Sequence, residues 1–393
     1  MTDDPRPGVS PAPAAACPGG NGSALAPTGL GQVFAAIDLG TNNCRMLVAR
    51  PNLAESERDD GARPENTRPE NPRAEFRVID SFSRITRLGE GVSGSGRLSD
   101  DAMDRTIDAL KCCADKMERR RVNASRQVAT EACRRAANCA EFLDRVTRET
   151  GLALEIISAH EEATLALKGC AALLDFNIPY ALIFDIGGGS TEVLFVHIAD
   201  ARNIAVQGCI SLPMGVVTVA EDCGGGDLCG RTYQAVSDRV QKLLEPFEAV
   251  HGIREKIAAG VTQMIGTSGT VTTLGGLHLG LNRYDRAAVD GLMLGFDALH
   301  ATSQALCGKT LQQRAAEPCI GWQRADLMLA GCAILEAICR MWPVGRLKVA
   351  DRGLREGLLM DLIHPSTLHV EPGRMHPAPA QPSALHQPSR LPS

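Results

Sequence analysis

The sequence has no long apolar run and no excess of positive charge. No segment approaches the roughly 18 consecutive apolar residues that a membrane helix requires, although 44% of the residues are hydrophobic. The formal net charge is −5, so the overall charge does not favour nucleic acid, and local arginine or lysine side chains would have to bind any polyanion. We therefore expect neither a membrane nor a nucleic-acid partner.

Paired cysteine motifs are also missing. The chain has 14 cysteines, yet none forms a Cys-x-x-Cys pair, and several lie in apolar segments, such as Cys112, Cys170 and Cys332. Scattered thiols of this kind indicate reduced, buried side chains rather than disulfides or a metal site. Residues 1–30 lack the apolar core of a signal peptide. The sequence thus predicts a cytoplasmic protein.

The composition divides the chain into two predicted domains and three predicted unstructured segments. Segments rich in proline and polar residues predict a disordered arm over 1–31, a flexible insertion over 51–75 and a disordered tail over 365–393. Between them apolar strands alternate with helical patterns, which is typical of the α/β class. The length favours two domains, which we place at 32–175 and 176–364.

Individual elements can be placed by their periodicity. Ser99 is a predicted N-cap, because two aspartates follow it and Met103, Ile107 and Leu110 then recur on one helix face. Further strands are predicted at 33–37, 46–49, 76–79, 127–129, 154–157, 181–184, 204–211 and 347–349. Further helices are predicted at 159–175, 231–250, 269–278, 295–307 and 324–341.

The most informative motif follows the apolar strand at 181–184. The strand ends in Asp185, and three glycines, two hydroxyl residues and Glu192 come next. Successive N–H groups in a glycine-rich turn form an anion-binding concavity, and two carboxylates beside it suit Mg²⁺ or Mn²⁺. A hairpin turn with spare glycines is the alternative. The predicted phosphate contacts here are Gly187, Gly188, Gly189, Ser190 and Thr191.

The same design recurs near the start of the chain, and a third loop of different design adds further hydroxyls and amides. The strand at 33–37 leads into Asp38, glycine, small polar residues and Arg45, and then into a second strand. A third loop, 265–270, precedes the predicted helix at 269–278, where the helix N-terminus could hold a phosphate. The predicted phosphate contacts in these two loops are Gly40, Thr41, Asn42, Gly266, Ser268, Gly269 and Thr270.

The order and spacing of the motifs resemble the exopolyphosphatase and guanosine pentaphosphate phosphohydrolase (Ppx/GppA) family from about Val33 to Leu362. The matching stretches are 38–45, 128–130, 157–163, 185–192, 266–270, 324–326 and 353–357. This family belongs to the superfamily of actin, the sugar kinases and the chaperone ATPases. The resemblance therefore implies two actin-like (ribonuclease H-like) domains with an interdomain cleft that holds the ligand.

The resemblance also implies an activity. It implies hydrolysis of terminal phosphoanhydride bonds in inorganic polyphosphate or guanosine pentaphosphate, with Glu162 as the base for water and with Asp185 and Glu192 as catalytic acids and Mg²⁺ ligands. Glu161 would be a capping or supporting acid. Asp38 would be the parallel acid of the other domain, and the resemblance places Arg45 and Arg355 against the polyanion, with Arg87 as a further candidate.

Several alternatives remain open at this level. Without the resemblance, Glu161 and Glu162 are carboxylates in a first helical turn, where the helix dipole favours them. A non-catalytic polyphosphate or alarmone sensor would keep the phosphate loops without needing a base, and a sugar-kinase-like phosphotransferase is a third possibility. Longer family members carry an additional helical domain, so a short form is expected here, with less surface for a long chain. A homodimer is possible.

Overall fold

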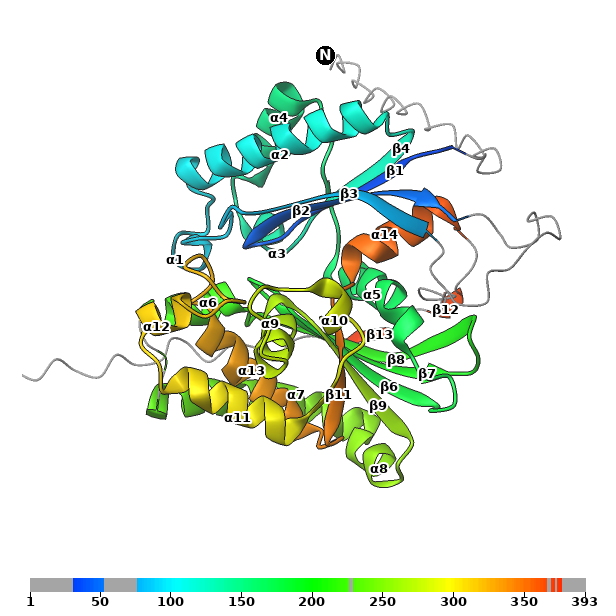
Figure 1. Ribbon diagram of the computed structural model, residues 1–393, viewed down its shortest axis with the longest axis vertical. Coiled ribbons are helices and arrows are strands. Elements are labelled where there is room, and N and C mark those ends of the chain that lie inside the picture. Colours follow the sequence, from blue (N-terminus) through cyan, green and yellow to red (C-terminus); the bar gives the residue numbers. More distant parts are fainter. Residues whose placement is uncertain are drawn as a thin grey trace, which may run out of the picture.

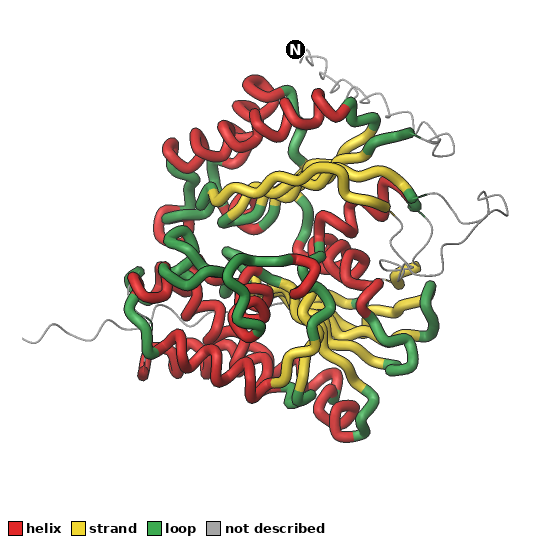
Figure 2. The backbone as a smooth tube through the Cα atoms, in the orientation of Figure 1, coloured by secondary structure: helices red, strands yellow, loops and turns green. Residues whose placement is uncertain are grey.

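The computed structural model describes most of the chain. The described residues are 31–52, 76–225, 228, 230–365, 369–371 and 373–376. Almost all of the predicted arm, most of the predicted insertion and much of the predicted tail lie outside them. The structure contains two separate sheets with helices around and between them (Figure 1, Figure 2). The predicted α/β class with two actin-like domains is confirmed.

The N-terminal sheet has the strand order β3-β2-β1-β4-β5. Strands β1 and β2 form an antiparallel hairpin, and β4 pairs in parallel with β1. The long helix α2 and helix α4 cover one face, and the short helices α1 and α3 lie at the strand ends. The bounds are β1 Phe34–Leu39, β2 Asn43–Pro51, β3 Phe76–Ile85, β4 Ala124–Ala129, β5 Glu155–Ile156, α1 Val92–Ser95, α2 Asp100–Arg120, α3 Glu131–Arg135 and α4 Cys139–Thr150.

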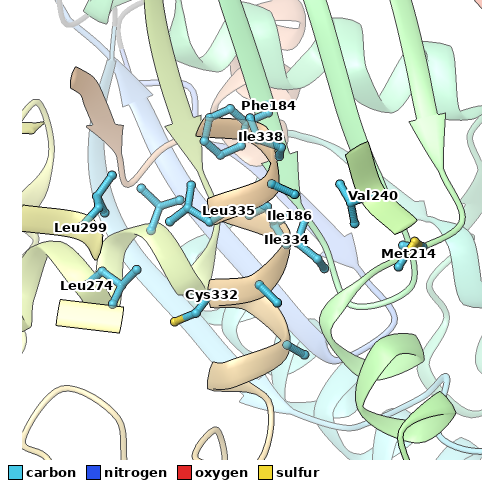
Figure 3. Packing of buried hydrophobic residues seen from close by; sticks show 14 of the residues in the cluster. Phe184, Ile186, Met214, Val240, Leu274, Leu299, Cys332, Ile334, Leu335 and Ile338 are labelled. Atoms are coloured by element: carbon cyan, nitrogen blue, oxygen red, sulfur yellow. The ribbon is translucent and has the colours of Figure 1, made fainter. Parts of the chain in front are cut away.

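The C-terminal sheet has the order β10-β11-β9-β6-β7-β8-β12, and β13 also pairs with β8. Leu335 and Ile338 of α13 belong to the large buried cluster that includes Phe184 of β6 (Figure 3). The strands are β6 Tyr180–Ile186, β7 Thr191–Ile198, β8 Asn203–Leu212, β9 Thr262–Thr267, β10 Met293–Gly295, β11 Arg346–Ala350, β12 His369–Glu371 and β13 Arg374–His376. The helices are α6 Val216–Asp222, α7 Gly230–His251, α8 Ile253–Ala258, α9 Gly269–His278, α10 Arg286–Val289, α11 Phe296–Cys307, α12 Leu311–Ala315 and α13 Met328–Met341.

Two helices, α5 (Ala159–Cys170) and α14 (Leu354–Ile363), lie between the sheets (Figure 1). They approach closely because glycine stands at the crossing: a Cβ added to Gly169 would lie 1.9 Å from the carbonyl oxygen of Gly353, and one added to Gly357 would lie 2.0 Å from that of Leu165. Helix α14 packs on the N-terminal sheet through a cluster that includes Phe34. The predicted range 176–364 therefore ends in a helix that returns to the first domain's sheet.

The tail holds a correction. We predicted disorder over all of 365–393, but β12 and β13 pair in parallel with β8. The outer side of β8 offers unpaired backbone groups to any extended segment nearby, and Val370 and Met375 add partly buried apolar contacts. The proline-rich composition concealed these two short strands, and the prediction of disorder is wrong for them.

Other sequence expectations can be compared directly. Ser99 caps α2, and its side chain accepts a hydrogen bond from the amide of Ala102. Helix α9 begins and ends at the predicted residues. The cysteines of the described ranges are all free thiols. None of the helices in those ranges combines the length and the apolar character needed to cross a membrane.

Candidate active site

The site is a cleft where the two Asp-Gly hairpins face each other. The β1–β2 turn and the β6–β7 turn approach so closely that a Cβ added to Gly188 would lie 2.9 Å from the Cβ of Thr41. Helix α9 contributes its N-terminus to the same cleft. The lining includes Asp38, Gly40, Thr41, Asn42, Asn43, Arg45, Thr130, Glu131, Glu162, Asp185, Gly187, Gly188, Gly189, Ser190, Ser268, Gly269, Thr270 and Arg324.

Local hydrogen bonds shape these loops. The amide of Gly40 donates to the carbonyl of Asn43, and the amide of Gly187 donates to that of Ser190, both at 2.9 Å. The two hairpins therefore have matching tight turns. Ser268 caps α9 by accepting from the amide of Val271 at 3.0 Å. This cap leaves the first amides of α9 directed at the cleft, which favours an anion there.

Asp38, Glu162 and Asp185 line the cleft, and Glu192 lies behind it. Burial is the main reason that the pKa values of Asp38, Glu162, Asp185 and Glu192 are all raised, and neighbouring negative charge adds to the shift for Asp185 and Glu162. For Asp185 the pKa rises to about 7. Asp185 and Glu192 are direct cross-strand neighbours on β6 and β7. Such an accumulation of acids favours a bound cation.

Glu162 is held by an arginine from another segment. Arg134 of α3 donates from Nη1 to Glu162 Oε2 at 2.8 Å and to the carbonyl of Ile157 at 2.8 Å, and its Nε donates to Glu131 at 3.1 Å. This positive charge lowers the pKa of Glu162, against the larger effect of burial. The second oxygen of Glu162 has no hydrogen-bond partner among the described residues, so it can accept one from a ligand or water.

The neighbouring acid has a different environment. Glu161 receives a hydrogen bond from Arg126 at 2.6 Å, and its backbone amide donates to Ser158, the N-cap of α5. Its side chain is 41% exposed, whereas that of Glu162 is 15% exposed. The two adjacent glutamates thus separate into an exposed ion pair and a largely buried carboxylate in the cleft.

Arg45 and Arg324 line the cleft, and Arg355 lies next to it. The guanidinium groups of Arg45, Arg324 and Arg355 make no hydrogen bond or ion pair with any described residue. Burial lowers the pKa values of Arg324 and Arg355, and the positive charge of Arg45 lowers both further, while the negative charge of Glu356 opposes the shift for Arg355. Buried cations normally find a counter-charge. Arg45 and Arg324, which line the cleft, are therefore placed where they could bind an anion.

Some predicted site residues lie outside the cleft lining. The hydroxyl of Thr191 donates to the carbonyl of Met214 at 2.6 Å, which is a structural contact. Gly266 is packed against a ring, because an added Cβ would lie 2.5 Å from Phe184. Glu192 is buried behind the cleft and accepts from Ser211 at 2.8 Å. Arg355 does not line the cleft, but it lies close enough to interact with Asp38 and Arg45.

Sequence reasoning missed several cleft residues. Thr130 and Arg324 stand in stretches that matched the family, yet no chemical argument selected them. Arg134 and Glu131 belong to α3, a short helix that no periodicity revealed. Arg87 was a candidate for contact with the polyanion. In the structure it instead pairs with Asp326 of the other domain and does not line the cleft.

We next consider whether the oxygen atoms at the cleft suit a divalent cation. Among the residues the structure describes, no three His, Cys, Asp or Glu side chains converge into a metal site of their own. Asp185 lines the cleft without a hydrogen-bond partner there, and the buried Oδ1 of Asn42 is also unpaired. Oxygen donors suit Mg²⁺ or Mn²⁺, and Mg²⁺ usually takes one or two carboxylates with phosphate oxygens. The residues therefore fit a cation that binds together with a phosphate ligand.

The fold is that of an actin-like protein with two sheets, and the loops of both domains line one cleft. The model of the Ppx/GppA phosphatase family matches residues 70–366. The chain belongs to this family and is a phosphatase.

Relatives with curated names support this assignment. Exopolyphosphatase 2 of Mycobacterium tuberculosis is 32% identical over 342 residues, which cover 84% of this chain and 98% of that protein. The guanosine-5'-triphosphate,3'-diphosphate pyrophosphatase of Aeromonas hydrophila is 29% identical and matches 84% of this chain, which spans 59% of that protein.

Solved structures agree. A Ppx/GppA family member from Aquifex aeolicus has a TM-score of 0.62 at 28% identity and covers 84% of this chain and 97% of its own. An exopolyphosphatase from Cytophaga hutchinsonii has a TM-score of 0.72 over 87% of this chain and 100% of its own, at 21% identity. At 21% identity, the similarity to the Cytophaga hutchinsonii structure supports the fold alone.

Proposed function

We propose that this protein hydrolyses the terminal phosphoanhydride bond of inorganic polyphosphate or guanosine pentaphosphate and releases orthophosphate. One observation carries the proposal: a largely buried carboxylate, Glu162, shares a cleft with three phosphate-type loops and with Arg45 and Arg324. The loops and arginines can bind a chain of phosphates, and the carboxylate can act on water beside it. The names of the relatives fit both substrates.

The carboxylate is suited to proton transfer. Arg134 fixes one oxygen of Glu162, so the other can accept a proton from water as the water attacks the terminal phosphorus. Burial raises the pKa of Glu162 and makes it a stronger base than a surface glutamate. The bond from phosphorus to the bridging oxygen then breaks, and orthophosphate leaves from a chain shortened by one phosphate.

The phosphate charge must be held while this happens. Catalysis of phosphoryl transfer depends mainly on positioning and electrostatic stabilisation. Backbone amides of the two hairpins and of the α9 N-terminus can donate to phosphate oxygens, and Arg45 and Arg324 can offset negative charge. We propose Asp185 as the protein ligand of Mg²⁺ or Mn²⁺, with Glu192 behind it adding negative charge. The bound cation would neutralise phosphate charge.

A non-catalytic sensor is the alternative function. A sensor needs the loops and the arginines but has no use for a base held in the cleft. The ion pair between Arg134 and Glu162 would then be only structural. The hydrolase explains why one of two adjacent glutamates is buried beside the phosphate loops while the other is paired at the surface.

The decisive experiment compares two isosteric variants. Glu162→Gln keeps the size of the side chain but cannot accept a proton, so turnover should fall at least ~100-fold with little change in KM. Glu161→Gln is the matched control and should stay close to wild type. Phosphate release from medium-chain polyphosphate and from guanosine pentaphosphate, measured side by side, gives the readout and the substrate preference. Normal turnover by Glu162→Gln would refute the assignment of the base, and no turnover of either substrate by the wild type would favour the sensor.

A further inference from the structure

A short loop links the two sides of the cleft. Residues 86–91, which we call the latch loop, follow β3 and precede α1. The amides of Thr86 and Arg87 donate to the carbonyl of Asn42 at 2.9 and 3.0 Å, and that of Gly89 donates to the carbonyl of Thr41 at 2.9 Å. The latch loop therefore lies directly against the phosphate loop of the N-terminal domain.

The same loop contacts the C-terminal domain. Arg87 Nη2 donates to both carboxylate oxygens of Asp326, at 3.1 and 2.9 Å, and to the carbonyl of Gln323 at 3.3 Å. The amide of Gly91 donates to Glu221 of α6 at 2.8 Å. Figure 1 shows α1 facing α6 where the domains meet. Two separate contacts thus join the domains through a loop of six residues.

Arg87 contacts residues 323–326, and this segment contains one of the arginines that line the cleft. Arg324 stands between Gln323 and Asp326 and lines the cleft. Its Nη1 would lie 3.8 Å from a Cβ added to Gly269, at the start of α9. The charge of Arg45 from the N-terminal domain acts on Arg324 and lowers its pKa. Without an anion, these two cations repel each other across the cleft, and the contact of Arg87 with Asp326 opposes that repulsion.

The two sides of the domain interface differ in kind. On one side α5 and α14 cross backbone to backbone at Gly169 and Gly357, where no side chain separates them. On the other side is an ion pair whose side chains are 33% and 26% exposed, so water can replace it. Arg87 also has a φ of 49°, a conformation uncommon for residues other than glycine, which the surrounding contacts hold in place.

We propose that Arg87 is a positioning residue that latches the domains through Asp326 and holds Arg324 against the polyanion. Helices α5 and α14 act as the hinge. A phosphate chain bound by Arg45 and Arg324 together relieves their repulsion and stabilises the latched state, and the latch in turn strengthens binding of the chain. The nature of the ligand rests on the proposed function; the latch itself rests on the contacts.

The kinetic test uses a double-mutant cycle. Arg87→Ala should raise KM for tripolyphosphate about fivefold or more, with kcat unchanged or higher. Asp326→Ala should do the same, and the double variant should be no worse than either single variant. The charge-swapped double variant Arg87→Asp/Asp326→Arg should reverse part of the rise in KM. Arg120→Ala is the control, since Arg120 forms a 2.8 Å pair with Asp80 inside one domain. Unchanged KM in both single variants, or additive losses, would overturn the proposal.

A second measurement does not require activity. Small-angle X-ray scattering on the full chain should give a larger radius of gyration for Arg87→Ala than for wild type and for Arg120→Ala, and added tripolyphosphate should reduce the difference. Identical scattering curves for all three proteins without ligand would refute the latch, even if the enzyme is active. Conversely, a wild type that hydrolyses neither substrate would refute the proposed function, and the scattering comparison would still decide on the latch.

Discussion

Replacing Arg134 with alanine should show how much its ion pairs contribute to stability and how much to the reactivity of Glu162. Arg134 is 18% exposed and pairs with Glu131 and Glu162, which are 16% and 15% exposed. Alanine leaves both carboxylates without their cation. Breaking a buried pair from one side typically costs about 3 to 5 kcal/mol, and water in the cleft should place this variant near the lower limit, about 3 kcal/mol.

The catalytic effect should be distinct from the loss of stability. Arg134 lowers the pKa of Glu162, so its removal raises that pKa further. Loss of a charge-assisted hydrogen bond of about 1.5 to 3 kcal/mol corresponds to roughly a 10- to 150-fold fall in kcat. The acidic limb of the pH–rate profile should move to higher pH, because Glu162 must lose its proton before it can act as a base. Added guanidinium ion should restore part of the activity.

Arg126→Ala provides the matched control. Arg126 pairs with Glu155 and with Glu161, the residue next to the proposed base, but these glutamates are 55% and 41% exposed. Exposed pairs contribute about 0 to 1 kcal/mol, so this variant should keep the wild-type stability and pH profile. Urea unfolding and initial rates from pH 5 to 9 provide both readouts. If Arg134→Ala shows the same pH profile as Arg126→Ala, then Arg134 does not tune the base.

Three further predictions follow from other parts of the structure. Phosphate release should require Mg²⁺ or Mn²⁺, and Asp185→Asn should raise the metal concentration for half-maximal rate; full activity in excess chelator would contradict this. Gly357→Ala places a Cβ 2.0 Å from the carbonyl of Leu165, so calorimetry should show destabilisation by about 1 to 3 kcal/mol, and an unchanged melting temperature would show that the helices can separate. Deleting 377–393 should leave the melting temperature unchanged, whereas deleting 366–393 should lower it, because only the second deletion removes β12 and β13; equal melting temperatures would mean that these strands add nothing to stability.

The sequence by itself determined the local elements that carry the phosphate loops. Asp38 and Asp185 each end an apolar strand before a glycine turn, and both turns depend only on residues within a few positions of each other. The caps Ser99 and Ser268 are equally local, because an N-cap bonds to an amide three residues ahead. These signals are contiguous, so they could be recognised without knowing the fold.

Tertiary structure decided which side chains share the cleft. Whether Glu161 or Glu162 is buried depends on how α5 sits between the two sheets. Glu192 points behind the cleft because β8 packs beside β7 and supplies Ser211 as its partner. Arg134 and Arg324 reach the site from segments nearly 200 residues apart. The path of α14 back to the N-terminal sheet is likewise fixed by packing against Phe34 and its neighbours. Burial and charge pairing act through space, and no spacing along the chain records them.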